Sequence, residues 1–289
     1  MRYLLITPEF PPTVGGVSRY LGILADGQKE MVVQQHLSGH WISVLWKIRG
    51  WAGDVDCVLI SHLLPYGYAA FFSGKPFVVI CHGLDVVGPL KNPWKKFWAH
   101  FILRRARKIV ANSNVTKNIL QHSYNLSSEK IAVVHPPLSW DQVTISKNFE
   151  THFAEQYGLK NKLTLLIVGR LVERKGVDVA IKAMKIVSET FPNAVLCVVG
   201  DGPERENLQR CVSLLQAESQ VILVGKKEDA EIRDAYRAAT IVLYPSKQCA
   251  DDVEGFGMSA ADAGIFGKAV IASRTGGLGE AIDDGVTVS

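Results

Sequence analysis

The sequence predicts two doubly wound α/β domains, each a parallel, Rossmann-like sheet covered by helices, that face each other across a cleft. Short apolar runs rich in Val and Ile alternate with helical stretches over nearly the whole chain, as in parallel strands buried on both faces. With 289 residues, the chain suits two domains of about 140 residues better than one. The alternation pauses once, at a polar segment that opens with Pro136 and Pro137.

The apolar runs predict two series of strands. The first series is Tyr3–Thr7, Met31–Gln35, Cys57–Ser61, Phe77–Cys81, Lys108–Asn112 and Ile131–His135. The second series is Thr164–Val168, Ala194–Val199, Val221–Val224, Ile241–Tyr244 and Ala269–Ser273, with helices at Asp178–Thr190, Pro203–Gln216 and Ala230–Ala239. The polar segment between the two series is typical of a linker. We therefore expect domains over residues 1–140 and 141–289.

Composition limits the class of protein. Hydrophobic residues make up 47% and charged residues 21%, which is ordinary for a globular protein. Three of the five cysteines, Cys57, Cys81 and Cys197, lie in strand-like runs, so we expect buried free thiols in a reducing compartment. The chain contains no CxxC pair, no signal-peptide core and no run of about 18 apolar residues. These features predict a cytoplasmic location.

Two loops of the first half carry residues that suit a ligand. Gly15 and Gly16 follow the first strand, and paired glycines let backbone N–H groups approach an oxyanion at a helix N-terminus. A plain tight turn would use the same residues. His82 directly follows the strand Phe77–Cys81 and can donate a hydrogen bond to a hydroxyl or phosphate. A structural histidine is the alternative.

Two cations follow the first strand of the second half. Arg170 leaves the strand end, and Lys175 lies near the start of the next helix. A guanidinium fork and a mobile ammonium at a helix N-terminus form a diphosphate site. They can also stabilise charge that develops on a diphosphate leaving group, a task often given to Mg²⁺. Solvated surface charges are the alternative.

Two acidic residues flank a glycine-rich turn after the strand Ile241–Tyr244. Glu254 precedes a predicted helix, Asp262 lies within it about two turns later, and Gly255 and Gly257 expose backbone amides between them. A carboxylate before the helix can hold sugar hydroxyls, and one further along can accept a ribose diol. The order of acids and glycines after a strand makes this the most specific signal in the chain.

Taken together, these motifs resemble those of the GT-B glycosyltransferases, specifically the retaining glycosyltransferase family 4, over the whole chain. The shared motifs, in order, are Gly15-Gly16, His82-Gly83 with Asp85, Val168-Gly169-Arg170-Leu171 with Lys175-Gly176, Val199-Gly200-Asp201-Gly202-Pro203, Pro245-Ser246, Glu254-Gly255-Phe256-Gly257, and Gly276-Gly277 with Glu280.

The resemblance implies a hexosyltransferase that uses a nucleoside diphosphate sugar as donor, without a metal or another cofactor, and retains the anomeric configuration. The acceptor would be a glycan or a lipid-linked molecule, in polysaccharide or glycolipid assembly. Residues 1–140 would form the acceptor side and residues 141–289 would bind the donor.

The resemblance also assigns roles to individual residues. Glu254 would lie beside the donor sugar and His82 would contact it, while Arg170 and Lys175 hold the diphosphate. The remaining contacts to donor phosphate, sugar or ribose would come from Gly15, Gly16, Phe256, Gly257, Met258 and Asp262. We expect Arg170, Lys175 and Glu254 to converge on one pocket opposite His82.

Two departures from the family favour other functions. Asp262 stands where the family usually has a glutamate, and the sequence stops at Ser289 where the family continues with a strand and helices. A non-catalytic homologue, either truncated or a partner subunit, is one alternative. A sugar-nucleotide epimerase of the same architecture is another.

A basic and aromatic segment suggests a membrane partner. From Val86 to Ser128 the chain has no Asp or Glu. Within residues 93–110, aromatic residues at helical spacing accompany a group of cations: Trp94, Phe97, Trp98 and Phe101 with Lys95, Lys96, Arg104, Arg105 and Lys108. An interfacial helix on anionic lipid has this composition, and a core helix with a solvated basic face is the alternative. Nucleic acid is not expected, since no binding module accompanies the patch. The predicted location is the cytoplasm, with peripheral attachment to the inner face of the plasma membrane.

Overall fold

The computed structural model describes residues 1–13, 15–35, 41–137, 152–249, 252–282 and 285. The chain forms two compact units. The first comprises Met1–Pro137 together with Ala250–Phe256, and the second comprises Leu138–Cys249 and Gly257–Ser289. The predicted boundary at residue 140 lies outside the described residues.

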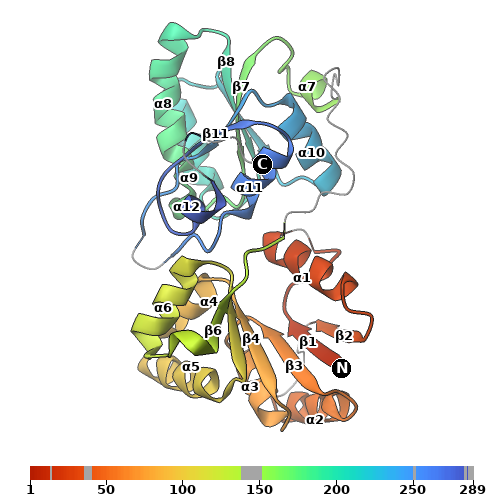
Figure 1. Cartoon of the computed structure of the whole chain (residues 1–289). Coiled ribbons are helices and arrows are strands. Elements are labelled where there is room, and N and C mark those ends of the chain that lie inside the picture. Colours follow the sequence, from red (N-terminus) through yellow and green to blue (C-terminus); the bar gives the residue numbers. More distant parts are fainter. Residues whose placement is uncertain (14, 36–40, 138–151, 250–251, 283–284, 286–289) are drawn as a thin grey trace. The chain divides into compact units, whose positions relative to one another are not determined.

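The first unit is a six-stranded parallel sheet in the order β2-β1-β3-β4-β5-β6. Its strands are β1 (Tyr3–Thr7), β2 (Met31–Gln35), β3 (Cys57–Ser61), β4 (Phe77–Cys81), β5 (Lys108–Ala111) and β6 (Ile131–Val133). Its helices are α1 (Gly16–Asp26), α2 (Trp41–Ala52), α3 (Tyr66–Phe72), α4 (Leu84–Val87), α5 (Pro93–Arg105) and α6 (Asn114–Tyr124), with short 3₁₀ turns at Gly88–Lys91 and Ser128–Lys130. Figure 1 shows this sheet with its helices. The core on one face of the sheet packs strand residues such as Ile60 and Val79 against Ile48, Ile102 and Leu120 from the helices.

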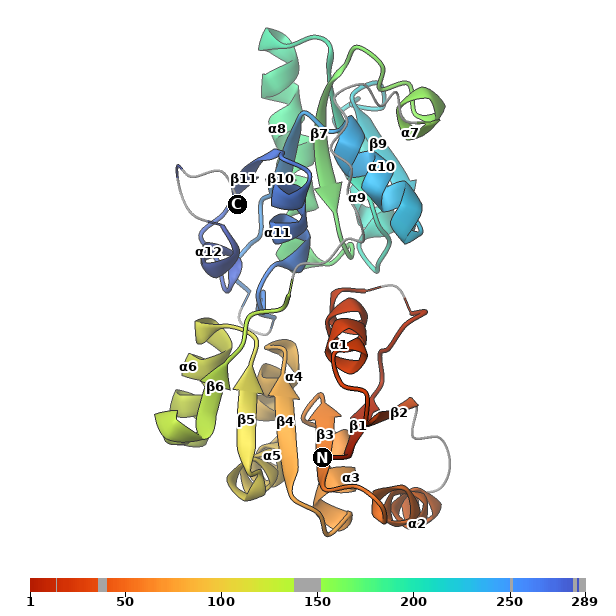
Figure 2. The same cartoon turned by 45° about the vertical axis from the view of Figure 1, so that its right-hand side comes forward.

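The second unit is a five-stranded parallel sheet in the order β11-β10-β7-β8-β9. Its strands are β7 (Leu163–Val168), β8 (Ala194–Val199), β9 (Val221–Gly225), β10 (Ile241–Tyr244) and β11 (Ala269–Ala272). Its helices are α7 (His152–Gln156), α8 (Val177–Thr190), α9 (Arg205–Leu214), α10 (Asp229–Ala238), α11 (Met258–Ile265) and α12 (Leu278–Ala281), with a 3₁₀ turn at Glu173–Lys175. Separate cores fill the two faces of the sheet: α8 and α9 pack on one, and α7, α10 and α11 on the other (Figure 2).

The prediction of two doubly wound parallel sheets is confirmed, and the differences concern element ends. The helix predicted over Pro203–Gln216 spans Arg205–Leu214, because Gly202 lies against the carbonyl oxygen of Leu171, where a β-carbon would be 2.3 Å away. At the other end Gln216 takes a left-handed conformation with φ 53°. Within residues 93–110, the helix ends at Arg105 and Lys108 begins β5.

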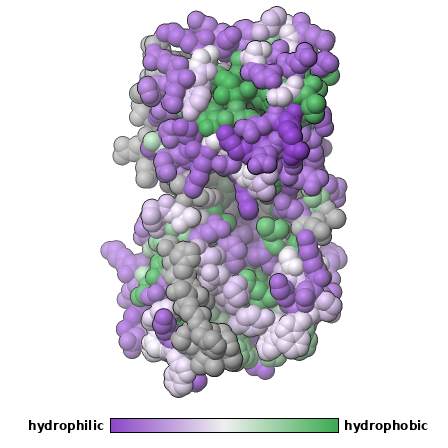
Figure 3. All heavy atoms as spheres, turned by 180° about the vertical axis from the view of Figure 1, so that it is seen from behind, coloured by the Kyte–Doolittle hydropathy of each residue, from purple (hydrophilic) through white to green (hydrophobic). Residues whose placement is uncertain are grey.

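The surface agrees with this layered arrangement. In the view of Figure 3, hydrophilic residues cover most of the described surface, and a compact hydrophobic area lies on the second unit. Among the described residues, no helix is long and apolar enough to cross a membrane. Cys57, Cys81 and Cys197 are buried free thiols, as predicted.

Candidate functional site

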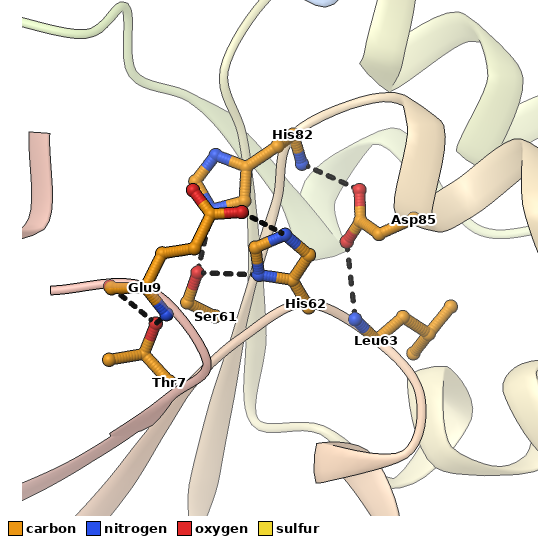
Figure 4. A network of polar contacts seen from close by, with 7 residues as sticks. All are labelled: Thr7, Glu9, Ser61, His62, Leu63, His82 and Asp85. Carbon is orange, nitrogen blue, oxygen red and sulfur yellow. Dashed lines mark hydrogen bonds and ion pairs between the residues drawn. The ribbon is translucent and has the colours of Figure 1, made fainter. Parts of the chain in front are cut away.

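The order of strands in the first unit places three loops together. The sheet order reverses between β1 and β3, and ligands of doubly wound sheets bind outside the carboxyl ends of the strands at such a switch point. Glu9 follows β1, His62 follows β3 and His82 follows β4. Figure 4 shows the three side chains gathered at this edge of the sheet.

A hydroxyl group links the two histidines. Ser61 Oγ lies 2.8 Å from Nε2 of His82 and 3.2 Å from Nδ1 of His62, and the two rings are 5.2 Å apart. Because a serine hydroxyl has one proton, Ser61 donates to one ring at most and accepts from the other. The second nitrogen of His62, Nε2, lies 4.0 Å from Oε1 of Glu9. The network therefore runs from the loop after β1 to the loop after β4.

Asp85 ties the loops after β3 and β4 to each other. Its Oδ1 accepts a hydrogen bond from the backbone N–H of His82 at 2.8 Å, and its Oδ2 accepts one from that of Leu63 at 3.2 Å. Burial raises the pKa of Asp85, although His62 and the backbone hydrogen bonds act in the opposite direction. Asp85 thus fixes the backbone that carries both histidines.

The environment of His82 keeps its ring neutral. Burial, followed by the charge of His62, lowers the pKa of His82 from 6.5 to about 3. At neutral pH the ring therefore acts as a hydrogen-bond partner and not as a cation. Since Ser61 engages Nε2, a hydrogen bond from this ring to a ligand has to use Nδ1.

The segment that carries Glu254 returns to the first unit and packs on the His82 turn. A β-carbon built on Gly255 would lie 2.1 Å from the carbonyl oxygen of His82, and one on Gly83 would lie 3.1 Å from Cα of Gly255. Asn112, after β5, donates its Nδ2–H to that same carbonyl oxygen at 3.2 Å. Glu254 itself is 9% exposed. The structure thus brings two predicted site residues, His82 and Glu254, to one place.

The other predicted residues of the first unit flank this place. Phe256 stacks on the ring of His135, which follows β6, with centroids 5.1 Å apart. Helix α1 begins at Gly16 and has Gly15 as its N-cap. A β-carbon on Gly15 would lie 3.7 Å from Oε2 of Glu9, so the glycine pair is beside the polar network.

The second unit has its own switch point, between β7 and β10. A β-carbon built on Gly169, which precedes Arg170, would lie 3.6 Å from Cε of Lys175 and 4.0 Å from its Nζ. The side chain of Lys175 therefore folds back over the strand end from which Arg170, an exposed residue, projects. The two predicted cations lie in the loop between β7 and α8.

Glycines allow the loops of this switch point to pack closely. Gly176 has φ 62° and caps α8, and a β-carbon there would lie 1.9 Å from the carbonyl oxygen of Pro245, after β10. An ion pair of 2.6 Å between Lys247 and Asp178 joins the same two segments. Burial alone would raise the pKa of Asp178, but hydrogen bonds from Lys247 and Lys182 outweigh it and lower that pKa.

Helix α11 holds the remaining predicted residues. It begins at Met258, and its N-cap Gly257 has φ 89° and packs against Leu278. Asp262 lies inside the helix and is 4% exposed. Glu254 precedes the helix and Asp262 lies within it, which is the order that the sequence predicted. The convergence of Arg170 and Lys175 with His82 involves both units and stays a prediction.

Sequence reasoning missed Glu9, Ser61 and His62. Their position in the sequence was the available signal. Ser61 is the last residue of β3 and His62 directly follows it, just as His82 directly follows β4, which ends at Cys81. Among the described residues, no group of three or more His, Cys, Asp or Glu side chains is arranged to hold a metal ion.

Two family models match the chain. Residues 32–140 match the model described as Glycosyltransferase Family 4, and residues 149–288 match the model described as Glycosyl transferases group 1.

Two curated relatives illustrate the similarity. The chain is 30% identical over 322 residues to a GDP-mannose-dependent alpha-(1-6)-phosphatidylinositol monomannoside mannosyltransferase of Mycolicibacterium smegmatis, covering 98% of this chain and 83% of that protein. It is 29% identical over 196 residues to a D-inositol 3-phosphate glycosyltransferase of Streptomyces scabiei, covering 64% of this chain. The match spans only 43% of the length of this second relative.

Among solved structures, Anabaena Alr3699/HepE in complex with UDP-glucose matches with a TM-score of 0.80 and 19% identity, over 99% of this chain and 84% of that one. At this level of identity the match shows a shared fold.

Proposed function

The chain belongs to glycosyltransferase family 4 with the GT-B fold, and on this premise we propose that it transfers a hexose from a nucleoside diphosphate sugar to a glycan or lipid-linked acceptor with retention of the anomeric configuration. The similarity to a GDP-mannose-dependent mannosyltransferase over 98% of the chain carries the proposal. That relative acts on a phosphatidylinositol monomannoside, which also supports a lipid-linked acceptor. The proposed location is the cytoplasm, with the acceptor at the inner face of the plasma membrane.

The donor diphosphate would bind to the second unit. Lys175 folds back over Gly169, which precedes Arg170, so two cations lie in one loop at the carboxyl end of β7. A guanidinium and an ammonium can neutralise both phosphates and stabilise the charge that develops as the nucleoside diphosphate leaves. In this proposal the two cations do the work for which other enzymes use Mg²⁺, and transfer needs no metal.

Glu254 and His82 would contact the transferred sugar. A carboxylate that is 9% exposed can accept hydrogen bonds from sugar hydroxyls with little competition from water. The neutral ring of His82 can donate to another hydroxyl without adding a charge near the diphosphate. Backbone groups of Phe256, Gly257 and Met258 would complete the contacts to sugar and phosphate, those of Gly15 and Gly16 would approach the phosphate, and Asp262 would accept the ribose hydroxyls.

The test measures transfer of labelled sugar by the purified chain from GDP-mannose or UDP-glucose to a membrane lipid extract. Arg170→Ala and Lys175→Ala each remove a charge-assisted hydrogen bond, so transition-state stabilisation should fall by about 2 kcal/mol. We therefore expect kcat/KM to fall roughly 30-fold. Glu254→Gln should abolish transfer and leave the folded state intact. Lys185→Ala, on the exposed face of α8, is the matched control and should retain full activity.

The same assay distinguishes the alternatives. An epimerase would convert the donor in the absence of the extract, and a non-catalytic homologue would bind a donor in a thermal-shift assay without turnover. Either outcome contradicts the proposal. NMR of the product determines whether the anomeric configuration is retained, and addition of EDTA should leave the rate unchanged if the cations replace a metal.

A further inference from the structure

Helix α5 presents an aromatic stripe away from the core. One side of the helix is fully buried in the first unit through Ala99, Ile102 and Leu103. Trp94 and Phe97 are 67% and 58% exposed. At 3.6 residues per turn, the aromatic stripe is centred roughly 140° around the helix from the buried side. Trp94 and Phe97 therefore do not lie inside the core, whereas Trp98 and Phe101 are partly buried.

The aromatic residues continue without a break onto a neighbouring helix. Ring centroids are 6.0 Å apart between Trp94 and Trp98, 5.8 Å between Trp98 and Phe101, and 5.2 Å between Phe101 and Phe71 of α3. Phe71 also contacts Phe72, which is 44% exposed. Helices α3 and α5 lie side by side in Figure 2. We call Phe71, Phe72, Trp94, Phe97, Trp98 and Phe101 the aromatic surface.

Cations surround the aromatic surface. They are Lys95, Lys96, Arg104 and Arg105 of α5. In the part of the chain that the structure describes, no carboxylate lies within ion-pair distance of these four residues. Arg105 also places its guanidinium 5.4 Å from the ring centroid of Phe101. Positive charge and aromatic surface thus occupy the same exposed area, and none of the described acidic residues pairs with these four cations.

An open pocket of about 370 Å³ adjoins the aromatic surface. Three cations, Lys75, Arg105 and Arg107, line it together with Phe71 and Phe77. Two of these lining residues are shared: Phe71 is part of the aromatic surface, and Arg105 is one of its surrounding cations. A pocket with three cations and aromatic walls suits a phosphate group that is attached to an apolar body.

We infer that the aromatic surface and its surrounding cations form an interfacial docking surface for an anionic lipid bilayer, in which the three-cation pocket receives a lipid phosphate. Exposed Trp and Phe enter the boundary between headgroups and acyl chains, and cations approach the anionic headgroups. The inference does not depend on sugar transfer, so either proposal can fail alone.

The ring geometry favours lipid over single-stranded nucleic acid. Nucleic-acid platforms present open ring faces on which bases stack. Here Trp98 meets Trp94, Phe97 and Phe101 edge to face, at interplanar angles of 76°, 80° and 84°. The rings therefore pack mainly on one another, although Trp94 and Phe97 lie nearly parallel at 25°, and such a packed cluster is compatible with insertion between lipids.

The test is co-sedimentation of the full chain with vesicles of phosphatidylcholine alone, or of phosphatidylcholine and phosphatidylglycerol in equal parts. We expect tight binding to the anionic vesicles, weak binding to the neutral ones, and weaker binding at high salt. Each cation near the surface contributes on the order of fivefold. The variant Lys95→Gln/Lys96→Gln/Arg104→Gln/Arg105→Gln should therefore bind on the order of 600-fold more weakly.

Matched controls test whether binding depends on this surface or on net charge and exposed hydrophobic residues in general. Replacing the exposed residues Lys29, Lys162, Lys185 and Lys226 by Gln lowers the net charge of +4 by the same amount and should leave binding unchanged. Trp94→Ser/Phe97→Ser should weaken binding roughly tenfold, whereas Leu214→Ser/Ile186→Ser, at sites 84% and 71% exposed, should have no effect.

Two further arms complete the test. Lys75→Gln/Arg107→Gln should reduce the preference for phosphatidylglycerol. The urea-unfolding midpoint should be unchanged in every variant of this surface, which shows that each one folds. Equal sedimentation of wild type and the charge-removal variant would overturn the inference. Binding that ignores salt, or tight binding of a single-stranded oligonucleotide that displaces the vesicles, would overturn it too.

Discussion

Gly255 lies against the backbone carbonyl of His82: a β-carbon on Gly255 would be 2.1 Å from that oxygen. The two residues are 173 positions apart in the sequence (255 − 82). Asn112 donates to the same oxygen and would itself lie 2.8 Å from the added β-carbon. The close approach fixes the position of the neighbouring residue, Glu254, relative to the His82 turn, so a glycine at 255 is required by packing.

Gly255→Ala should separate Glu254 from His82. The added methyl would meet the backbone of His82 and the amide group of Asn112, and neither can move aside easily. The overpacking should lower the free energy of unfolding by about 1–3 kcal/mol. We expect transfer activity to fall by more than the loss of folded protein explains. Urea unfolding and kcat measured on the folded fraction test this. Gly88→Ala is the control, since its β-carbon would meet nothing within 4 Å. Full activity of Gly255→Ala would contradict the expectation.

The pKa of His82 predicts how stability varies with pH. The unfolded chain binds a proton at His82 near pH 6.5, and the folded protein does so only near pH 3. Between these values the unfolded state binds more protons, so stability falls as the pH falls, by at most about 1.4 kcal/mol per pH unit. His82→Gln should lack this contribution.

Unfolding free energies of wild type and His82→Gln at about pH 7 and about pH 5 test the sign. The raised pKa of Asp85 acts in the opposite direction, but it is present in both proteins and largely cancels in their difference. His122→Gln, at an exposed position of α6, is the comparison for replacing a histidine outside the network. Identical pH dependence in all three proteins would show that the His82 ring is not kept neutral.

Ser61 should act as a positioning residue for the two histidines. Ser61→Ala removes the hydroxyl between Nε2 of His82 and Nδ1 of His62, and loss of a buried hydrogen bond costs about 1–1.5 kcal/mol. We expect kcat to fall roughly tenfold and the pH–rate profile to shift, because His82 loses its orienting partner.

Ser73→Ala provides the comparison for Ser61→Ala. Ser73 is also buried, and its hydroxyl donates to the carbonyl oxygen of Ala70 outside the network. This variant should lose similar stability with an unchanged pH–rate profile. If both variants change activity in the same way, the effect of Ser61 is one of stability alone.

The sequence predicted the strands well because burial on both faces leaves a continuous apolar run. Ala194–Val199 and Ile241–Tyr244 have the predicted bounds. Helix ends were less accurate, since they depend on contacts between loops. The helix after β8 begins at Arg205 because Gly202 and the residues next to it are held against Leu171, and no local pattern encodes that contact.

The candidate site was predictable only where a residue stood out within its own loop. His82, Arg170 and Lys175 could be selected because each follows a strand. The link between Glu9, Ser61 and His62 requires the order β1-β3-β4, which periodicity does not give. The approach of Gly255 to His82 likewise depends on a return of the chain to the first unit.

Gly176→Ala should disturb the placement of Lys175 through the neighbouring loop. Gly176 and Gly158 share φ 62°, so alanine at either position is strained by about 1–2 kcal/mol. Only at Gly176 would the β-carbon also lie 1.9 Å from the carbonyl oxygen of Pro245, whereas at Gly158 it would meet nothing within 4 Å. The difference in unfolding free energy between the two variants therefore isolates the contact, and we expect about 2 kcal/mol more loss for Gly176→Ala.

Because Lys175 precedes Gly176, the Gly176→Ala variant alone should also weaken donor binding, measured by isothermal titration with GDP-mannose and UDP-glucose. Equal losses of stability and of donor affinity in the two variants would contradict the role assigned to the Gly176–Pro245 contact.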